Sequence, residues 1–164
     1  MALAAAYDRL EQIVPLGSRV AVDTSAVIAY LDGGEPASAA AAWLFDGRIA
    51  QSRNAGVISA ITVAEILVGP MRLGPAAVAV ADGFLGFFGE LEVSPVTHAI
   101  ARSAASIRAS SGLGLPDSIV LATAIERDAG VVVTNDRRWV ATARRLDLPL
   151  TICLLGDYVS PSSA

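Results

Sequence analysis

Gly130-Val131-Val132-Val133-Thr134-Asn135-Asp136 is the stretch of sequence that decides the fold. Three consecutive valines after a glycine are typical of a strand that is buried on both faces of a sheet. Asp136 follows almost directly, and we expect it to open a helix that runs to Leu146. A buried strand that passes straight into a helix is the unit from which parallel sheets are built.

The rest of the chain repeats this alternation of short apolar runs and helical segments. Further strands are expected at residues 19–22, 57–59, 91–93 and 150–154. Further helices are expected at residues 1–14, 23–31, 36–45, 62–68, 75–88, 95–110 and 116–129. This alternation predicts an α/β fold with three layers, α/β/α, around a central, mostly parallel sheet of about four to five strands.

The bulk composition fits one domain that needs no disulfides. The chain has 164 residues, a mean hydropathy of +0.56, a single cysteine and no repeat or Gly/Ser linker. Charged residues interrupt every long apolar stretch, and the N-terminus lacks a basic region before an apolar run, so we expect no membrane span and no signal peptide. A cytoplasmic protein is therefore expected. Its domains are expected to be a helical extension at 1–18, the main domain at 19–155 and a tail at 156–164.

The charge balance argues neither for nor against a nucleic-acid partner. The net charge is −4, whereas most nucleic-acid binders carry a basic excess. All twelve basic residues are arginine. A GC-rich genome explains that bias, although arginine is also the residue best suited to bidentate phosphate contacts.

Four carboxylates stand where parallel sheets place their ligands. Asp23 and Asp136 each follow a predicted strand, Asp117 opens a predicted helix, and Glu65 lies inside the helix after the strand at 57–59. The carboxyl ends of parallel strands meet at one edge of the sheet, where such folds bind their ligands. We therefore expect the four carboxylates to lie together.

Each carboxylate also has a simpler interpretation. Aspartate is a favoured helix N-cap, so any one of the three aspartates is explained as a cap. Glu65 is too far inside its apolar helix to cap it, and no basic residue lies three or four positions away. A wet edge of the helix, a distant arginine, protonation or a metal ion would each explain it. Four ionised carboxylates in one pocket repel one another without a cation, and all-oxygen ligands favour Mg²⁺ or Mn²⁺.

Four segments resemble the motifs of the PIN-domain family, and most closely those of its VapC-like toxin ribonucleases. They are Val-Asp-Thr-Ser at 22–25, Ser-Ala-Ile-Thr-Val-Ala-Glu-Ile-Leu-Val-Gly at 59–69, Pro-Asp-Ser-Ile-Val-Leu-Ala-Thr-Ala at 116–124 and Val-Val-Thr-Asn-Asp at 132–136. Their order and spacing fit the family, and the resemblance spans about residues 19 to 155. The extra segment at 1–18 and the acidic balance depart from the family pattern.

The resemblance implies a PIN-like nuclease domain at 19–155 and a Mg²⁺- or Mn²⁺-dependent endoribonuclease that leaves a 5′-phosphate and a 3′-hydroxyl. Its metal ligands and catalytic residues would be Asp23, Glu65, Asp117 and Asp136. Ser25 and Thr134 fall where the family places polar groups that orient a carboxylate or a water, although capping or turn bonds explain them equally well. The resemblance also implies an RNA substrate, a cognate antitoxin that occupies the active-site groove, and a homodimer.

Several other residues have weaker claims. Three candidates to contact RNA phosphates or the antitoxin are Arg137, Arg138 and Arg144. The simpler interpretation is that they lie on a solvated helix face. Trp43 and Trp139 suit packing better than base stacking.

Two other functions compete with the nuclease. One is a catalytically idle PIN-like module that binds RNA or protein, which the four intact carboxylates disfavour. The other is an aspartyl-phosphate enzyme with Asp23 as the acceptor. Such sites need a lysine to meet the phosphoryl group, and the chain has none.

Overall fold

The computed structural model describes residues 2–158, and its five strands form one sheet in which every neighbouring pair is parallel. The strands are β1 (Val20–Val22), β2 (Gly56–Ser59), β3 (Leu91–Ser94), β4 (Val131–Thr134) and β5 (Thr151–Leu154), in the order β3-β2-β1-β4-β5. The predicted α/β class and parallel sheet are confirmed.

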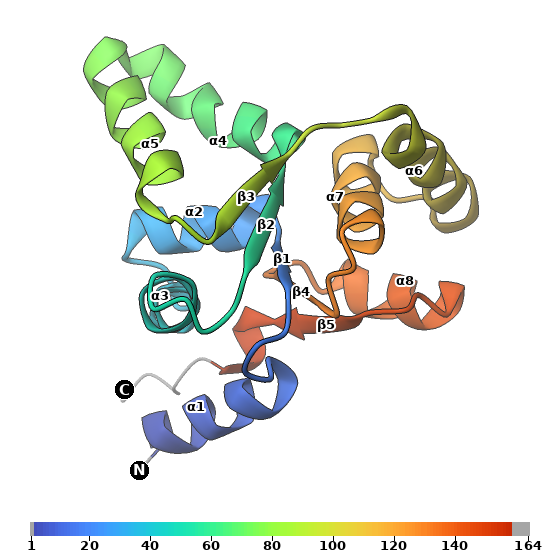
Figure 1. Ribbon diagram of the computed structural model, residues 1–164, viewed down its shortest axis with the longest axis horizontal. Helices are drawn as coiled ribbons and strands as arrows, with labels where there is room; N and C mark the ends of the chain where they lie inside the picture. Colours follow the sequence, from blue (N-terminus) through green and yellow to red (C-terminus); the bar gives the residue numbers. More distant parts are fainter. Residues whose placement is uncertain (1, 159–164) are drawn as a thin grey trace.

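Helices cover both faces of the sheet (Figure 1). One face carries α2 (Thr24–Asp32), α3 (Ser38–Leu44), α4 (Ala60–Leu73) and α5 (Pro75–Phe87), and the other carries α6 (His98–Ser111), α7 (Leu115–Glu126) and α8 (Arg138–Leu146). The alternation of side chains along each strand divides the interior into two cores. Val20 and Val22 pack toward α2 and α3, whereas Ala21 between them packs toward α7.

Helix α1 (Ala2–Ile13) belongs to the same packed body as the sheet. Leu10 and Val14 are buried in the core on the α2 side. Tyr7 stacks on Trp43 with ring centroids 6.4 Å apart. Within the predicted extension at 1–18, residues 2–13 thus form a helix with a buried face. Of the predicted tail, residues 156–158 lie in a 3-10 helix (Leu155–Tyr158), and residues 159–164 lie outside the described residues.

Two helices continue past the points where the sequence predicts their ends. Helix α4 continues past Gly69 and Pro70 to Leu73, although proline cannot donate a helical hydrogen bond, and the Pro70 carbonyl accepts from the N–H of Gly74 at 3.0 Å. The chain after α3 passes Asp46-Gly47 as a π-helix (Phe45–Ile49) because Phe45 and Ile49 are both fully buried.

Two helix starts also differ from the prediction. Helix α6 begins at His98 rather than at Pro95, because the Thr97 hydroxyl caps it and accepts from the N–H of Ile100 at 3.2 Å. Helix α8 begins at Arg138, and Asp136 lies just before it.

The strand order places a crevice beside β1. The chain moves from β1 to β2 and β3 on one side, then returns to the other side of β1 with β4 and β5. Parallel sheets bind ligands at such a reversal, beyond the carboxyl ends of the two strands. Asp23 follows β1, and Thr134 ends β4 with Asn135 and Asp136 directly after it, so both segments border this point. No helix in the described part of the chain is long and apolar enough to cross a membrane.

Candidate metal centre

Asp23 is a buried carboxylate held by two hydroxyl groups. It is 6% exposed, and it lies between the end of β1 and the start of α2. Its Oδ2 atom accepts hydrogen bonds from Ser25 Oγ at 2.6 Å and Thr134 Oγ1 at 2.8 Å, while the backbone N–H of Ser25 lies 3.4 Å away. Asp23 is thus the N-cap of α2 and also the centre of a network that joins β1 to β4.

Ser25 and Thr134 orient Asp23 directly. Ser25 Oγ also accepts from the backbone N–H of Asn135 at 2.8 Å, and Thr134 Oγ1 accepts from that of Asp136 at 3.1 Å. The two interpretations of these hydroxyls are therefore compatible, because each satisfies local backbone groups and holds the carboxylate.

Glu65 is half-buried on α4, and its partner is Thr24, which lies in the Val-Asp-Thr-Ser motif but is not among the candidate site residues. Thr24 Oγ1 donates to Glu65 Oε2 at 2.5 Å and lies 3.3 Å from Thr62 Oγ1. Within residues 2–158, no arginine forms an ion pair with Glu65. The position of Thr24 next to Asp23, at the first turn of α2, is the signal that would have found it.

Asp117 and Asp136 share one arginine. Arg138 Nη2 lies 3.3 Å from Asp117 Oδ2 and 2.5 Å from Asp136 Oδ2, and Arg138 Nε donates to both oxygens of Asp136. The backbone N–H of Arg138 also donates to Asp136 Oδ1 at 2.9 Å, as an N-terminal cap does. Asp117 lies in the first turn of α7 and is not its cap residue.

The two carboxylates feel opposite electrostatic environments. Burial, reinforced by the charges of Asp23, Asp136 and Glu65, raises the pKa of Asp117 above the usual aspartate value, although Arg138 acts against this. The hydrogen bonds from Arg138 lower the pKa of Asp136. The repulsion that four carboxylates should exert on one another is therefore visible at Asp117.

The four predicted carboxylates line one hollow of about 330 Å³, here called the acidic hollow. Its walls are Asp23, Thr24, Ser25, Ile28, Glu65, Asp117 and Asp136. Every charged group in this lining is a carboxylate, which is the donor chemistry that Mg²⁺ and Mn²⁺ prefer. Arg138 pairs with two of the carboxylates, which shows that the hollow attracts positive charge.

The acidic hollow does not have the geometry of a complete metal site in this conformation. No three Asp, Glu, His or Cys side chains within residues 2–158 converge closely enough to hold an ion. Three of the carboxylates already have other partners. Thr24 donates a hydrogen bond to Glu65, and Arg138 forms ion pairs with Asp117 and Asp136. The residue types fit a divalent cation, and a modest rearrangement of side chains has to accompany its binding.

The other candidates fall in different places. Arg137 pairs with Asp157 at 3.1 Å, whereas Arg144 lines a separate hollow with Ile13 beside β5. Of the three predicted arginines, the structure brings only Arg138 to the carboxylates. Trp139 is fully buried and Trp43 packs under α1, which agrees with packing and not with base stacking.

Comparison with known families gives one match over most of the chain. The PIN domain model matches residues 20–145, a range that contains all four carboxylates. No curated protein matches the sequence.

Solved structures share the fold at low sequence identity. A toxin–antitoxin complex from Klebsiella pneumoniae is 23% identical, with a TM-score of 0.57, and the match covers 71% of this chain and 86% of that one. The Mycobacterium tuberculosis VapC20 toxin, described as cleaving the sarcin–ricin loop, is 18% identical, with a TM-score of 0.60 and coverage of 74% and 93%. VapBC2 from Rickettsia felis, bound to a promoter DNA fragment, is 17% identical, with a TM-score of 0.61 and coverage of 83% and 98%.

Proposed function

The chain belongs to the PIN domain family, and on this premise we propose that it is a divalent-metal-dependent endoribonuclease, the toxin of a type II toxin–antitoxin module. The observation that carries the proposal is that Asp23, Glu65, Asp117 and Asp136 all line the acidic hollow. They come from four separate segments of the chain and meet where the strand order reverses. Helix capping does not explain this arrangement, because Glu65 lies inside α4 and Asp117 is not the cap residue of α7.

The four carboxylates are proposed to hold Mg²⁺ or Mn²⁺. A bound ion would supply a hydroxide nucleophile and neutralise charge on the attacking and leaving oxygens of a phosphodiester. Ser25 and Thr134 keep Asp23 in one orientation, and Thr24 does the same for Glu65. Burial and the neighbouring carboxylates raise the pKa of Asp117, so a nearby cation would favour its charged form.

The proposed protein partners are a cognate antitoxin and a second copy of the chain. Several structural relatives are toxin–antitoxin complexes, which supports the first. This chain also exposes large apolar side chains on α2, α4 and α5, as expected of a surface that a partner covers. They are Ile28, Leu31, Val68, Met71, Leu73, Val80 and Phe87. An RNA substrate and a cytoplasmic location complete the proposal.

A second candidate function is a PIN-like module that binds RNA or protein without cleaving it. The observation that favours it is the pairing of Arg138 with both Asp117 and Asp136, which offsets one of the four negative charges without a metal. The nuclease is preferred because Arg138 is 67% exposed at its side chain and held only at the rim, so a cation can displace it.

Cleavage of RNA by the purified protein separates the two candidates. Total cellular RNA is incubated with the wild type or Glu65→Gln, each with Mg²⁺, with Mn²⁺ or with EDTA. Discrete products from the wild type alone, abolished by EDTA, support the nuclease. Equal products from both proteins would place the activity in a contaminant or another site. A folded wild type that leaves every RNA intact would instead favour the binding module.

A further inference from the structure

Helix α8 carries its arginines on two different faces. Arg138, Ala141, Thr142 and Arg145 follow the spacing i, i+3, i+4 and i+7, which places them along one side of a helix. They line a hollow of about 270 Å³ together with the end of α6 at Ser111, Gly112 and Leu113. We call this hollow the arginine groove. Arg144 points to the other hollow, beside Ile13 and β5.

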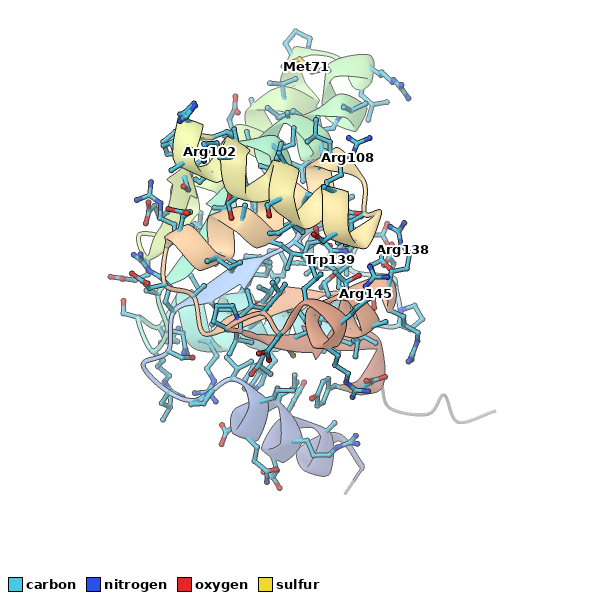
Figure 2. All side chains as sticks on the ribbon, turned by 90° about the vertical axis from the view of Figure 1, so that its right-hand side faces the viewer. Met71, Arg102, Arg108, Arg138, Trp139 and Arg145 are labelled. Carbon is cyan, nitrogen blue, oxygen red and sulfur yellow. The ribbon has the colours of Figure 1, made fainter. Side chains whose placement is uncertain are left out.

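The arginine groove is built to keep positive charge at the surface. Arg145 Nη2 donates to the carbonyl oxygen of Ser111 at 2.6 Å, which fixes the guanidinium against the end of α6. No acidic side chain pairs with Arg145 or with the exposed Arg108, one turn before Ser111, in the part of the chain that the structure describes. Figure 2 shows Arg108, Arg138 and Arg145 on one side of the molecule, with Arg102 at the opposite end of α6.

Arg138 joins this groove to the acidic hollow. Its guanidinium contacts Asp117 and Asp136, which line the acidic hollow, and the same side chain lines the arginine groove. The two hollows are therefore separated by one side chain. Any chain of phosphates that passes the carboxylates on this side meets Arg138 first and then Arg145.

We infer that the arginine groove between α6 and α8 binds a phosphate of the RNA strand next to the one that is cleaved. The inference rests on the proposed nuclease function, and it means that the RNA strand leaves the acidic hollow through the arginine groove. Arg145 is already held in place, so it loses little side-chain freedom when it binds an anion. Guanidinium groups match phosphate oxygens in a bidentate fashion, and contacts of this kind position a strand without reading its sequence.

The groove also resolves the conflict between an acidic protein and an anionic substrate. With a net charge of −4, the protein as a whole does not attract RNA. Arg138 contacts two carboxylates of the acidic hollow, and Arg145 lines the adjoining groove with it, so positive charge lies directly beside the hollow. Attraction over a distance shorter than the Debye length is far less screened than attraction by the whole molecule.

Binding of RNA to a cleavage-deficient protein tests the inference. Fluorescence anisotropy is measured with a labelled single-stranded RNA oligomer in Mg²⁺, using Glu65→Gln alone and Glu65→Gln combined with Arg145→Gln, Arg108→Gln or Arg102→Gln. Arg145→Gln and Arg108→Gln should each weaken binding about three- to tenfold and reduce the slope of log affinity against log salt by about 0.7, the value for one contact to single-stranded RNA. Arg102→Gln, an exposed arginine at the far end of α6, should change neither quantity.

Each outcome bears on one proposal separately. Equal effects of Arg102→Gln, of Arg145→Gln in the groove and of Arg108→Gln one turn from it would overturn the groove while leaving the nuclease intact. A wild type that cleaves no RNA would contradict the nuclease, and the binding measurement would still decide the groove. Arg145 also ties α8 to α6, but loss of that tie lowers stability without changing the salt slope. Arg108 makes no such tie, so its variant keeps the test decisive if Arg145→Gln unfolds.

Discussion

The Thr24 hydroxyl donates a hydrogen bond of 2.5 Å to Glu65 Oε2 and joins the first turn of α2 to the middle of α4. Outer residues that orient a carboxylate typically contribute about 10- to 100-fold to metal affinity or activity. Thr24→Val keeps the shape of the side chain and removes the donor. We expect it to weaken Mn²⁺ binding by about that factor, as measured by calorimetry, and to slow RNA cleavage in parallel.

Thr24→Ser is the matched control, because it retains the hydroxyl. It should restore most of the metal affinity that Thr24→Val loses. Equal losses in both variants would show that the methyl group matters and that the hydrogen bond to Glu65 does not.

Arg138 competes with the metal for two of the four carboxylates. Arg138→Met keeps much of the length of the side chain and frees Asp117 and Asp136 from their ion pairs. Because Arg138 is exposed and its ion pairs are screened, we expect Mn²⁺ to bind only about two- to fivefold more tightly, while RNA binds more weakly. Arg137→Met removes an arginine that pairs with Asp157 instead, and it should leave Mn²⁺ affinity unchanged. Weaker Mn²⁺ binding by Arg138→Met would mean that the arginine positions the carboxylates for the ion.

Asp117 should destabilise the metal-free protein at neutral pH. Its pKa is raised in the folded state by burial and by the neighbouring carboxylates. A carboxyl group with a raised pKa contributes stability below the usual aspartate pKa and loses that contribution as pH rises through the folded-state value. Asp117→Asn should therefore melt a few degrees higher than the wild type at pH 7 in EDTA, and the difference should fade near pH 4. A lower melting temperature at pH 7 would show that the contact with Arg138 outweighs the repulsion.

The sequence predicts the parts of this fold that depend on local pattern. The valines at 131–133 form a central strand, and the aspartates that follow two strands meet at one edge because parallel strands share a direction. Glu65 could be singled out because an acidic residue inside an apolar helix needs an explanation. These inferences use only spacing and residue type, which are the properties that a sequence displays.

Contacts between distant segments could not be predicted in the same way. The bond from Thr24 to Glu65 spans 41 residues, and the ion pair from Arg138 to Asp117 spans 21. The burial of helix α4 could not be predicted either. Its sequence is apolar on nearly all sides and suggests a buried helix, whereas Val68 and Met71 are 49% and 62% exposed. The helical spacing predicts that Arg138 and Arg145 lie on a different face of α8 from Arg144. Which of the two faces packs against α6 depends on the packing of the whole domain.

Helix α1 should stabilise the domain through the ion pair between its Glu11 and the buried Arg48. The Arg48 side chain is only 3% exposed, lies over the Trp43 ring, and pairs with Glu11 at 3.2 Å, while its Nη1 has no partner within residues 2–158. Removal of Glu11 leaves the buried guanidinium with less compensation, which costs about 1–3 kcal/mol. Glu11→Ala should therefore lower the free energy of unfolding in urea by about that amount.

Asp8→Ala is the matched control for Glu11→Ala, because Asp8 is an exposed acidic residue on the same helix with no ion pair in the described structure. It should leave the free energy of unfolding within about 0.5 kcal/mol of the wild-type value. Neither variant should change the cleavage rate per folded molecule, since the hydrogen bonds of the acidic hollow involve no residue of α1. A Glu11→Ala protein as stable as Asp8→Ala would show that water replaces the carboxylate at Arg48, and that the other contacts of α1, such as those of Leu10 and Tyr7, are enough to hold it.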